Sequence, residues 1–403
     1  MVLEPVDPNQ LFRDRRRQQR RRRRKRRLVL IAAVPAAASL LAGVVWLRGD
    51  GGAAGAVEPV AATKPGAAAA KPRVTNPLAP RAAPAEIRGV HVTMALASLP
   101  GKLEEYLRLP GLNTLQLDIK DENGEVAFVP SAVPLAREIG AAGRYYRPRE
   151  VARLARRHGV YLVGRIVCFE DPVLSGARPA LAVRRADGSR WVNHAGLGWV
   201  DPYNRDVWRY LGDLAVASAK LGFDEIQFDY VRFPTDGDTD GMRFPAGTST
   251  PMAWNIAEFV HYVSRRVRAT GARVSADVFG LSATRDLGIG QIPRRISRYL
   301  DAIYPMVYPS HYGSGEYGLA DPSAMPGPTV AASLSDFNRE LEGRRTRIVP
   351  WLQDFSYGRT YTLADVKEQI DAAAAAGSDG FLLWNAAGVY SDGALRYRPI
   401  VAE

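Results

Sequence analysis

The chain has 403 residues and a formal net charge of +12, with 54 Lys and Arg against 42 Asp and Glu. Residues 1–27 carry +9 of that charge, so the other 376 residues carry only +3, which argues against a nucleic-acid groove in the folded part. A single cysteine, Cys168, excludes an intramolecular disulfide framework, a cysteine-rich zinc module and a CxxC redox centre.

The N-terminal part of the chain has the pattern of a membrane anchor. Residues 28–47 form a stretch of twenty residues without a charge, which as a helix covers about 30 Å, the thickness of a bilayer core. Because the basic tail precedes this stretch, the positive-inside rule puts the tail in the cytoplasm and the rest of the chain outside. A cleaved signal peptide has a shorter apolar core, so we expect an uncleaved single-pass anchor. An arginine run could also bind RNA or anionic lipid, but beside a span, topology and lipid contact explain it.

The next segment, residues 48–85, is rich in Ala, Pro and Gly and contains no aromatic residue. Such a stretch cannot form a core, and its prolines favour an extended spacer. The sequence therefore predicts a linker that holds a folded domain, residues 86–403, away from the membrane, in the periplasm or at the cell surface.

Apolar runs of strand length alternate with helical patterns throughout the predicted domain. Strands are expected at residues 89–94, 113–119, 160–167, 225–230, 273–279, 302–308, 347–352 and 380–384. Helices are expected at residues 102–107, 148–158, 206–221, 252–270, 291–299, 333–341 and 363–376. Eight strands separated by helices predict an α/β fold, the (β/α)8 TIM barrel. A doubly wound open sheet is the alternative, but no GxGxxG or GxxxxGK[ST] follows the first strand.

Carboxylates stand where several of these strands end, which is the edge at which a TIM barrel carries its chemistry. Asp118, Asp229, Asp277 and Asp354 end or follow the second, fourth, fifth and seventh predicted strands. Aromatic residues stand at the same level, and their faces suit the apolar faces of a sugar ring. Glycosidic cleavage requires one protonated and one ionised carboxyl group. The pattern therefore points to a carbohydrate-active site.

Several motifs carry a family resemblance. The runs FDEIQFDYVRFP, SADVFG, YPMVYPSHY, PWLQDF and FLLWNA resemble the glycoside hydrolase domain family DUF4015, over about residues 88–390. The resemblance implies a TIM-barrel fold and O-glycosyl hydrolase activity. One departure is Glu170 in the segment CFEDP, where the family more often has Lys. This departure argues against a catalytic Glu170 and favours the acids of the fourth and fifth strands.

Asp229 and Asp277 are the predicted catalytic pair. Asp229 follows Phe228 on a strand and so faces the opposite way from this apolar neighbour, as expected for the nucleophile, although it could instead pair with Arg232. Asp277 follows two small residues, which leave room near a cavity, and we expect it to be the acid/base.

Other residues at the same edge are predicted to bind substrate. They are Asp118, Lys120, Tyr230, Arg232, Tyr304, Tyr308, His311, Trp351, Asp354, Trp384 and Asn385. Each has a structural alternative: Asp118 could cap a turn or pair with Lys120, the Trp residues and Tyr308 could belong to the core, and His311 and Asn385 could be hydrogen-bonded structural groups.

Other chemistries lack their residues. The five histidines show no HExxH or similar pairing for zinc, and no GxSxG elbow is present for an esterase. The acidic loop at residues 235–241 resembles a calcium loop in composition only, because it lacks the glutamate of an EF-hand. Cys168 ends an apolar run, as a buried small side chain does. We therefore expect no metal and no cofactor.

Together these features predict a membrane-anchored, exported TIM-barrel glycosidase that acts on an extracytoplasmic polysaccharide and binds no nucleic acid. A catalytically inactive barrel that binds envelope glycan as a scaffold is the main alternative. A non-glycosidic hydrolase on the same fold is the third, because a fold alone does not fix function. The oligomeric state is left open.

Overall fold

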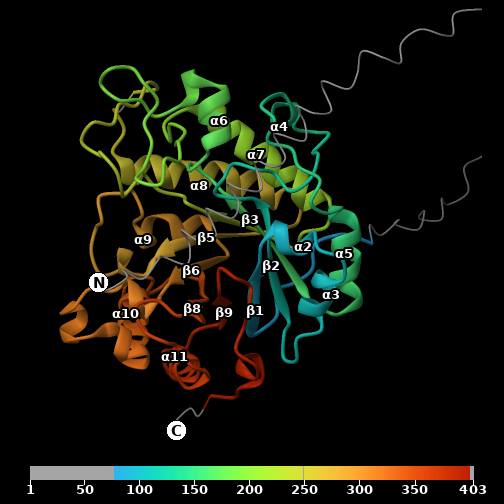
Figure 1. Ribbon diagram of the computed structural model, residues 1–403, viewed down its shortest axis with the longest axis vertical. Helices are drawn as coiled ribbons and strands as arrows, with labels where there is room; N and C mark the ends of the chain where they lie inside the picture. Colours follow the sequence, from blue (N-terminus) through green and yellow to red (C-terminus); the bar gives the residue numbers. More distant parts are fainter. Residues whose placement is uncertain (1–76, 248, 400–403) are drawn as a thin grey trace, which may run out of the picture. The chain divides into compact units, whose positions relative to one another are not determined.

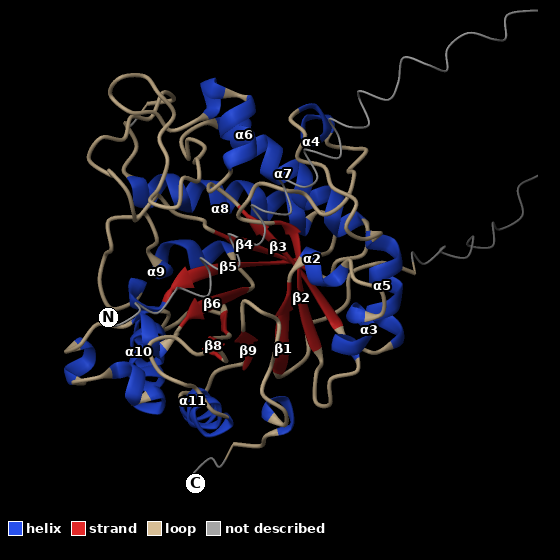
Figure 2. Cartoon of the chain, in the orientation of Figure 1, coloured by secondary structure: helices blue, strands red, loops and turns tan. Residues whose placement is uncertain are grey.

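Parallel strands close into a barrel in the structure, a computed structural model that describes residues 77–247 and 249–399 (Figures 1 and 2). The strands are β1 Ile87–Val92, β2 Thr114–Lys120, β3 Tyr161–Val167, β4 Glu225–Asp229, β5 Arg273–Phe279, β6 Ala302–Met306, β7 Arg347–Ile348, β8 Trp351–Gln353 and β9 Gly380–Trp384. Strands β1 to β6 pair in chain order, β8 and β9 continue the sheet, and β9 pairs with β1. The predicted eight-stranded parallel barrel is confirmed.

The seventh strand position is divided into β7 and β8. Both segments pair with β6, and Pro350 lies between them. A proline has no amide hydrogen to donate to a sheet, so the ladder is interrupted there. The other predicted strands agree with the structure to within about two residues at their ends.

Helices surround the barrel (Figure 2). They are α2 Met94–Ala97, α3 Lys102–Leu107, α4 Pro134–Glu138, α5 Pro148–Arg157, α6 Pro172–Ala177, α7 Arg205–Lys220, α8 Met252–Arg268, α9 Pro293–Ile296, α10 Pro326–Glu340 and α11 Leu363–Ala375. Helix α10 begins seven residues before its predicted start at 333, because Pro326 and Pro328 occupy its first turn, where proline is tolerated. The predicted helix 291–299 is the short α9 followed by a 3₁₀ turn, Ser297–Tyr299. Helices α2, α4 and α6, of four to six residues, were not predicted.

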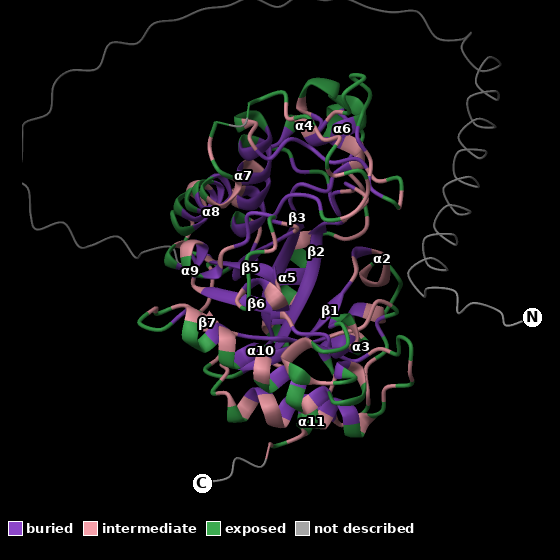
Figure 3. Ribbon diagram, turned by 90° about the vertical axis from the view of Figure 1, so that its left-hand side faces the viewer, coloured by how far each residue is buried: buried purple, intermediate pink, exposed green. Residues whose placement is uncertain are grey.

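Most strand residues are buried, and Figure 3 shows them in purple. Every residue of β1 to β4 is buried, because one face of each strand points into the barrel and the other packs against helices. The interior is unusually polar. Gln116 and Gln227 share a hydrogen bond there, and the carboxylate of Glu225 accepts hydrogen bonds from Ser275 at 2.5 Å and Tyr161 at 3.0 Å. This polar interior leads to the candidate site.

The last residues assigned to the linker by sequence lie against the barrel. Leu78 is buried, and Arg81 pairs with Asp224 at 2.7 Å next to the start of β4. Arg347 donates to the carbonyl oxygens of Pro84 and Ala85 at 3.0 and 2.7 Å. Contacts with the domain therefore extend back to Leu78.

The predicted tail (1–27), the predicted span (28–47) and most of the predicted linker lie outside the described residues. Within the part that the structure describes, none of the helices is long and apolar enough to cross a membrane.

Candidate active site

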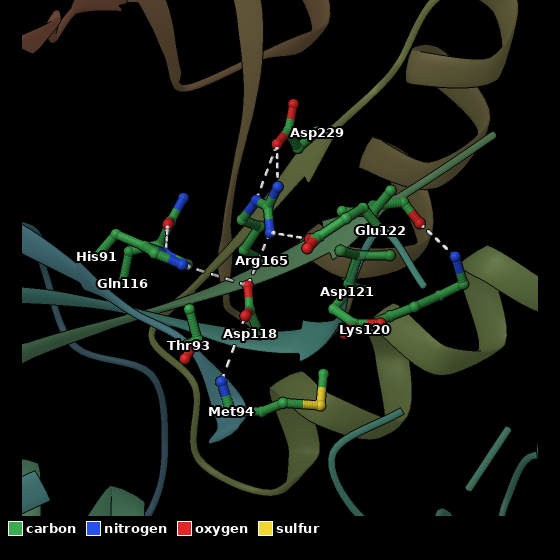
Figure 4. A network of polar contacts seen from close by, with 12 residues as sticks. His91, Thr93, Met94, Gln116, Asp118, Lys120, Asp121, Glu122, Arg165 and Asp229 are labelled. Atoms are coloured by element: carbon green, nitrogen blue, oxygen red, sulfur yellow. Dashed lines mark hydrogen bonds and ion pairs between the residues drawn. The ribbon is translucent and has the colours of Figure 1, made fainter. Parts of the chain in front are cut away.

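Arg165 of β3 lies between two carboxylates that come from the strands on either side of it (Figure 4). Its Nη1 donates to Oδ1 of Asp118 at 2.8 Å, and its Nε donates to Oδ2 of Asp229, also at 2.8 Å. All three side chains are buried. The positive charge therefore offsets the repulsion between these two buried acids, and Glu122 lies 3.7 Å from the same Nη1. Asp118 and Asp229 both form ion pairs with Arg165, whereas the suggested alternatives were pairs with Lys120 and Arg232.

The carboxylate of Asp229 is also held by the backbone. The amide of Tyr230 donates to Oδ1 of Asp229 at 2.6 Å, so both oxygens of this carboxylate accept hydrogen bonds. Tyr230 has a φ of 50°, a left-handed conformation that is unusual for an aromatic residue. Strained backbone of this kind persists where the surrounding contacts enforce it, often at functional sites. The turn after β4 therefore fixes Asp229 in one orientation.

Asp277 of β5 is the second predicted catalytic acid, and its surroundings differ from those of Asp229. Trp351 donates from Nε1 to Oδ1 of Asp277 at 2.7 Å, and no described residue forms an ion pair with this carboxyl. Burial raises the pKa of Asp277 well above its usual range, the nearby charge of Asp229 raises it further, and the Trp351 hydrogen bond opposes both. The two acids thus combine a buried carboxyl group of raised pKa with one that is paired with an arginine.

His91 of β1 supports this cluster from the side of the first strand. Its Nδ1 donates to Oε1 of Gln116 at 2.5 Å, and its Nε2 lies 3.8 Å from Oδ1 of Asp118. Burial lowers the pKa of His91 to about 3, and the charge of Arg165 lowers it as well, so the imidazole is neutral near pH 7. The imidazole stacks on Trp384 with ring centroids 4.3 Å apart. His91 therefore positions Trp384, the partly exposed ring at the end of β9.

Aromatic side chains lead from the acids towards solvent. Burial raises the pKa of the Tyr308 hydroxyl, and the nearby charges of Asp277 and Asp229 raise it further. His311 packs against Tyr308 and Tyr357 with ring centroids 5.5 and 5.9 Å apart, and both His311 and Tyr357 are exposed. These loops after β6 and β8 present ring faces of the kind that a sugar can cover.

Two predicted substrate contacts are occupied within the protein. Lys120 is fully buried, donates to the carbonyl of Val167 at 2.7 Å and pairs with Asp171 at 3.1 Å. Figure 4 shows its chain extending away from Arg165. The guanidinium of Arg232 is buried against aromatic rings and donates to the carbonyl of Phe233 at 3.0 Å. Neither cation is presented to a ligand, so the prediction that they contact substrate is not supported.

Other predicted substrate contacts have internal roles. Asp354 accepts hydrogen bonds from the amide and hydroxyl of Ser391 at 2.8 and 2.7 Å, and Asn385 donates to the carbonyl of Asp354. These hydrogen bonds connect Asp354, which follows β8, to the loop after β9. Tyr304 and Trp351 are almost fully buried, whereas Trp384 is partly exposed, with His91 stacked on its ring and the guanidinium of Arg165 5.5 Å from the ring centroid.

Sequence reasoning did not identify Arg165, Gln116 or His91 as site residues. A signal was present, since polar residues alternate along the strands, as in Gln116 and Asp118 on β2. Residues two apart face the same side of a strand, so this alternation marks the interior of the barrel. In the described part of the chain, no group of three or more His, Cys, Asp or Glu is placed to hold a metal ion.

The fold and site define a (β/α)8-barrel domain with a paired-carboxylate centre. A family model described as a putative glycosyl hydrolase domain, DUF4015, matches residues 89–390. The chain therefore belongs to the DUF4015 family, as its motifs suggested. No curated protein matches the chain.

Solved structures resemble the domain as well. The glycoside hydrolase domain of PgaB (BpsB) from Bordetella bronchiseptica is 17% identical, with 74% of this chain and 94% of that chain covered and a TM-score of 0.55. A hypothetical protein from Ruminiclostridium thermocellum is 36% identical over 47% of this chain and 97% of that chain, with a TM-score of 0.42. The spore cortex-lytic enzyme SleL from Bacillus megaterium is 11% identical over 77% and 73% of the two chains, with a TM-score of 0.48. At 17% identity, the likeness to the PgaB domain supports the fold alone.

Proposed function

We propose that this chain is a glycoside hydrolase in which Asp277 is the general acid/base and Asp229 is the nucleophile. The supporting observation is the contrast between the two carboxyls. Asp277 is buried with a raised pKa and has no ion pair among the described residues, whereas Asp229 pairs with Arg165 at 2.7 Å. Glycosidic cleavage uses one carboxyl group as the proton donor and a second one as the nucleophile.

In this mechanism the protonated Asp277 gives its proton to the glycosidic oxygen while Asp229 attacks the anomeric carbon. The bond to the leaving sugar breaks, and a covalent glycosyl-enzyme forms. Asp277, now a carboxylate that accepts the Trp351 hydrogen bond, then removes a proton from water. The water attacks the anomeric carbon, the bond to Asp229 breaks, and both acids return to their starting states. Trp384 and the rings around His311 would bind the faces of the sugars.

The substrate class follows from the predicted topology. An anchor at residues 28–47 with a cytoplasmic tail would put the barrel outside the cytoplasm, where the polymers within reach are envelope or extracellular polysaccharides. Cysteine labelling can test this topology, because Cys168 is buried and the chain has no other cysteine. In whole cells, an impermeant maleimide should label Gly66→Cys and spare Gln18→Cys. Labelling of Gln18→Cys alone would show that the orientation is the reverse of the predicted one.

A glycan-binding barrel without catalysis is the second candidate, because both oxygens of Asp229 are already hydrogen-bonded and Asp277 is buried. One assay separates the two. The full chain in detergent is incubated with envelope and plant polysaccharides, and the reducing ends released are counted. A hydrolase releases them and loses at least about 10²-fold of the rate in Asp229→Asn and in Asp277→Asn, while Asp206→Asn, an exposed acid of α7, does not. Binding without release, equal in all variants, would support the scaffold.

A further inference from the structure

A groove with a cavity volume of about 1430 Å³ runs along the outer side of the barrel, beside α5. Helix α5 lies at the periphery in Figure 1. Six cations line the groove: Arg144, Arg147, Arg149, Arg153, Arg157 and Lys220. Glu104 and Glu150 are the acids of the lining, so the groove carries +4, more than the +3 of all 376 residues after the basic tail.

These cations are available to a ligand. All six are exposed, and only Arg147 has an ion pair among the described residues, with Glu150 at 3.0 Å. Arg149, Arg153 and Arg157 are spaced four residues apart on α5, so they share one face of the helix and follow each other at about 6 Å. Such a row of guanidinium groups is complementary to a chain that carries negative charges at regular intervals.

One lining residue of the groove contacts the backbone of the candidate active site. Tyr146 lines the groove, and its hydroxyl donates to the carbonyl oxygen of Asp118 at 2.7 Å. Phe128, also in the lining, lies 6.2 Å from Tyr146 between ring centroids, and Val129 beside it is 43% exposed. Phe128 is itself buried and Val129 is exposed, so this part of the lining adds apolar surface to a groove that also carries the arginine row.

We propose that this groove binds an acidic polysaccharide, one that bears carboxylate or phosphate groups, as an extension of the chain held at the barrel mouth. That the ligand is a polysaccharide rests on the proposed function. That the ligand is acidic rests on the positive charge of the groove. A neutral glycan would leave the five cations other than Arg147 without a counter-charge. An acidic polymer would supply these counter-charges. Because the cations are exposed, salt should screen and weaken this binding.

Hydrogen exchange of the full chain tests this, because it reports binding at α5 separately from binding at the basic tail. Polygalacturonate or a teichoic acid should slow exchange at residues 144–157, and the two probes distinguish carboxylate from phosphate. The neutral, carboxyl-reduced galactan should not slow it. The variant Arg149→Gln/Arg153→Gln/Arg157→Gln should need at least tenfold more polymer to reach the same protection at residues 144–157. The matched variant Arg185→Gln/Arg298→Gln/Arg345→Gln, at three exposed arginines elsewhere, should bind as the wild type does.

Three results would overturn the inference: no protection with either acidic polymer, equal protection with the neutral galactan, or protection only with phosphatidylglycerol vesicles. Reducing-end release keeps the two proposals separate. Protection at α5 without release from any polymer would support the groove and contradict the hydrolase. Release that the triple α5 variant leaves unchanged, with no protection at α5, would support the hydrolase and contradict the groove.

Discussion

Trp351 and Asp277 are joined across the interior of the barrel by a hydrogen bond of 2.7 Å from the indole Nε1 to Oδ1. They come from β8 and β5, which are not neighbours in the sheet, because β6 lies between them. The bond favours the charged form of a carboxyl group whose burial favours the neutral form. Trp351 is therefore placed to moderate the acidity of Asp277.

Removing this donor should move the pH dependence of catalysis. In Trp351→Phe the carboxylate form of Asp277 loses a hydrogen bond, so the pKa of Asp277 rises further. Activity that needs protonated Asp277 should then persist to higher pH, and the alkaline limb of the kcat/KM profile should shift upward. Trp254→Phe, at an exposed tryptophan of α8, serves as the control and should leave the limb in place. A limb that stays put or moves downward in Trp351→Phe would contradict the assignment.

Asp277 should also make the stability of the fold depend on pH. Its pKa is higher in the folded than in the unfolded chain, so the folded state binds more protons. The stability that Asp277 contributes is present below the pKa of the unfolded chain and is lost as pH rises through the folded pKa. Asp277→Asn, which cannot ionise, should remove this loss. Urea unfolding from about pH 4 to pH 8 should show a smaller decline for Asp277→Asn than for the wild type, and parallel curves would refute the claim.

Arg165 should be important for folding because two buried carboxylates depend on it. Arg165→Met leaves Asp118 and Asp229 without their cation, and removing one partner of a buried pair costs about 3–5 kcal/mol. Arg298→Met, at an exposed arginine, should change the free energy of unfolding by no more than about 0.5 kcal/mol.

A second variant tests whether the loss of stability in Arg165→Met comes from the two unpaired carboxylates. Adding Asp118→Asn and Asp229→Asn to Arg165→Met removes the stranded charges, so part of the lost stability should return. If the triple variant is no more stable than Arg165→Met in urea unfolding, the carboxylates are not what Arg165 stabilises.

Lys120 provides a test of a residue that sequence reasoning assigned to substrate binding. Lys120→Met should destabilise the fold by about 3–5 kcal/mol, because Asp171 is then buried without its cation. Lys120→Met/Asp171→Asn should recover part of this loss, since Asn can still accept the hydrogen bond from the amide of Leu174 at the start of α6. The KM of the folded variants should equal that of the wild type. A large rise in KM without a change in stability would indicate that Lys120 contacts the substrate.

The barrel was predictable because its strands and helices carry local signals. Apolar runs of strand length and the acids at their ends can be read without knowing the register, and they led directly to Asp229 and Asp277. The contacts of Arg165 were not predictable in this way. Arg165 lies two residues before Val167 on β3, and its partners Asp118 and Asp229 can be identified only when the registers of β2 and β4 against β3 are known. The ion pair of Lys120 with Asp171 was not predictable for a similar reason, because the register of β2 against β3 shifts between Asp118 and Lys120.

The central claim is that Asp277 donates a proton while Asp229 attacks, and leaving-group dependence tests it most directly. Values of kcat/KM, which report the first, proton-donating step, are measured on the polysaccharide and on a 2,4-dinitrophenyl glycoside of the same sugar, whose leaving group needs no proton. Asp277→Asn should lose about 10²–10⁴-fold on the polysaccharide and far less on the dinitrophenyl glycoside, whereas Asp229→Asn should lose activity on both. Equal losses on the two substrates in Asp277→Asn, or full activity in Asp229→Asn, would contradict the proposed roles.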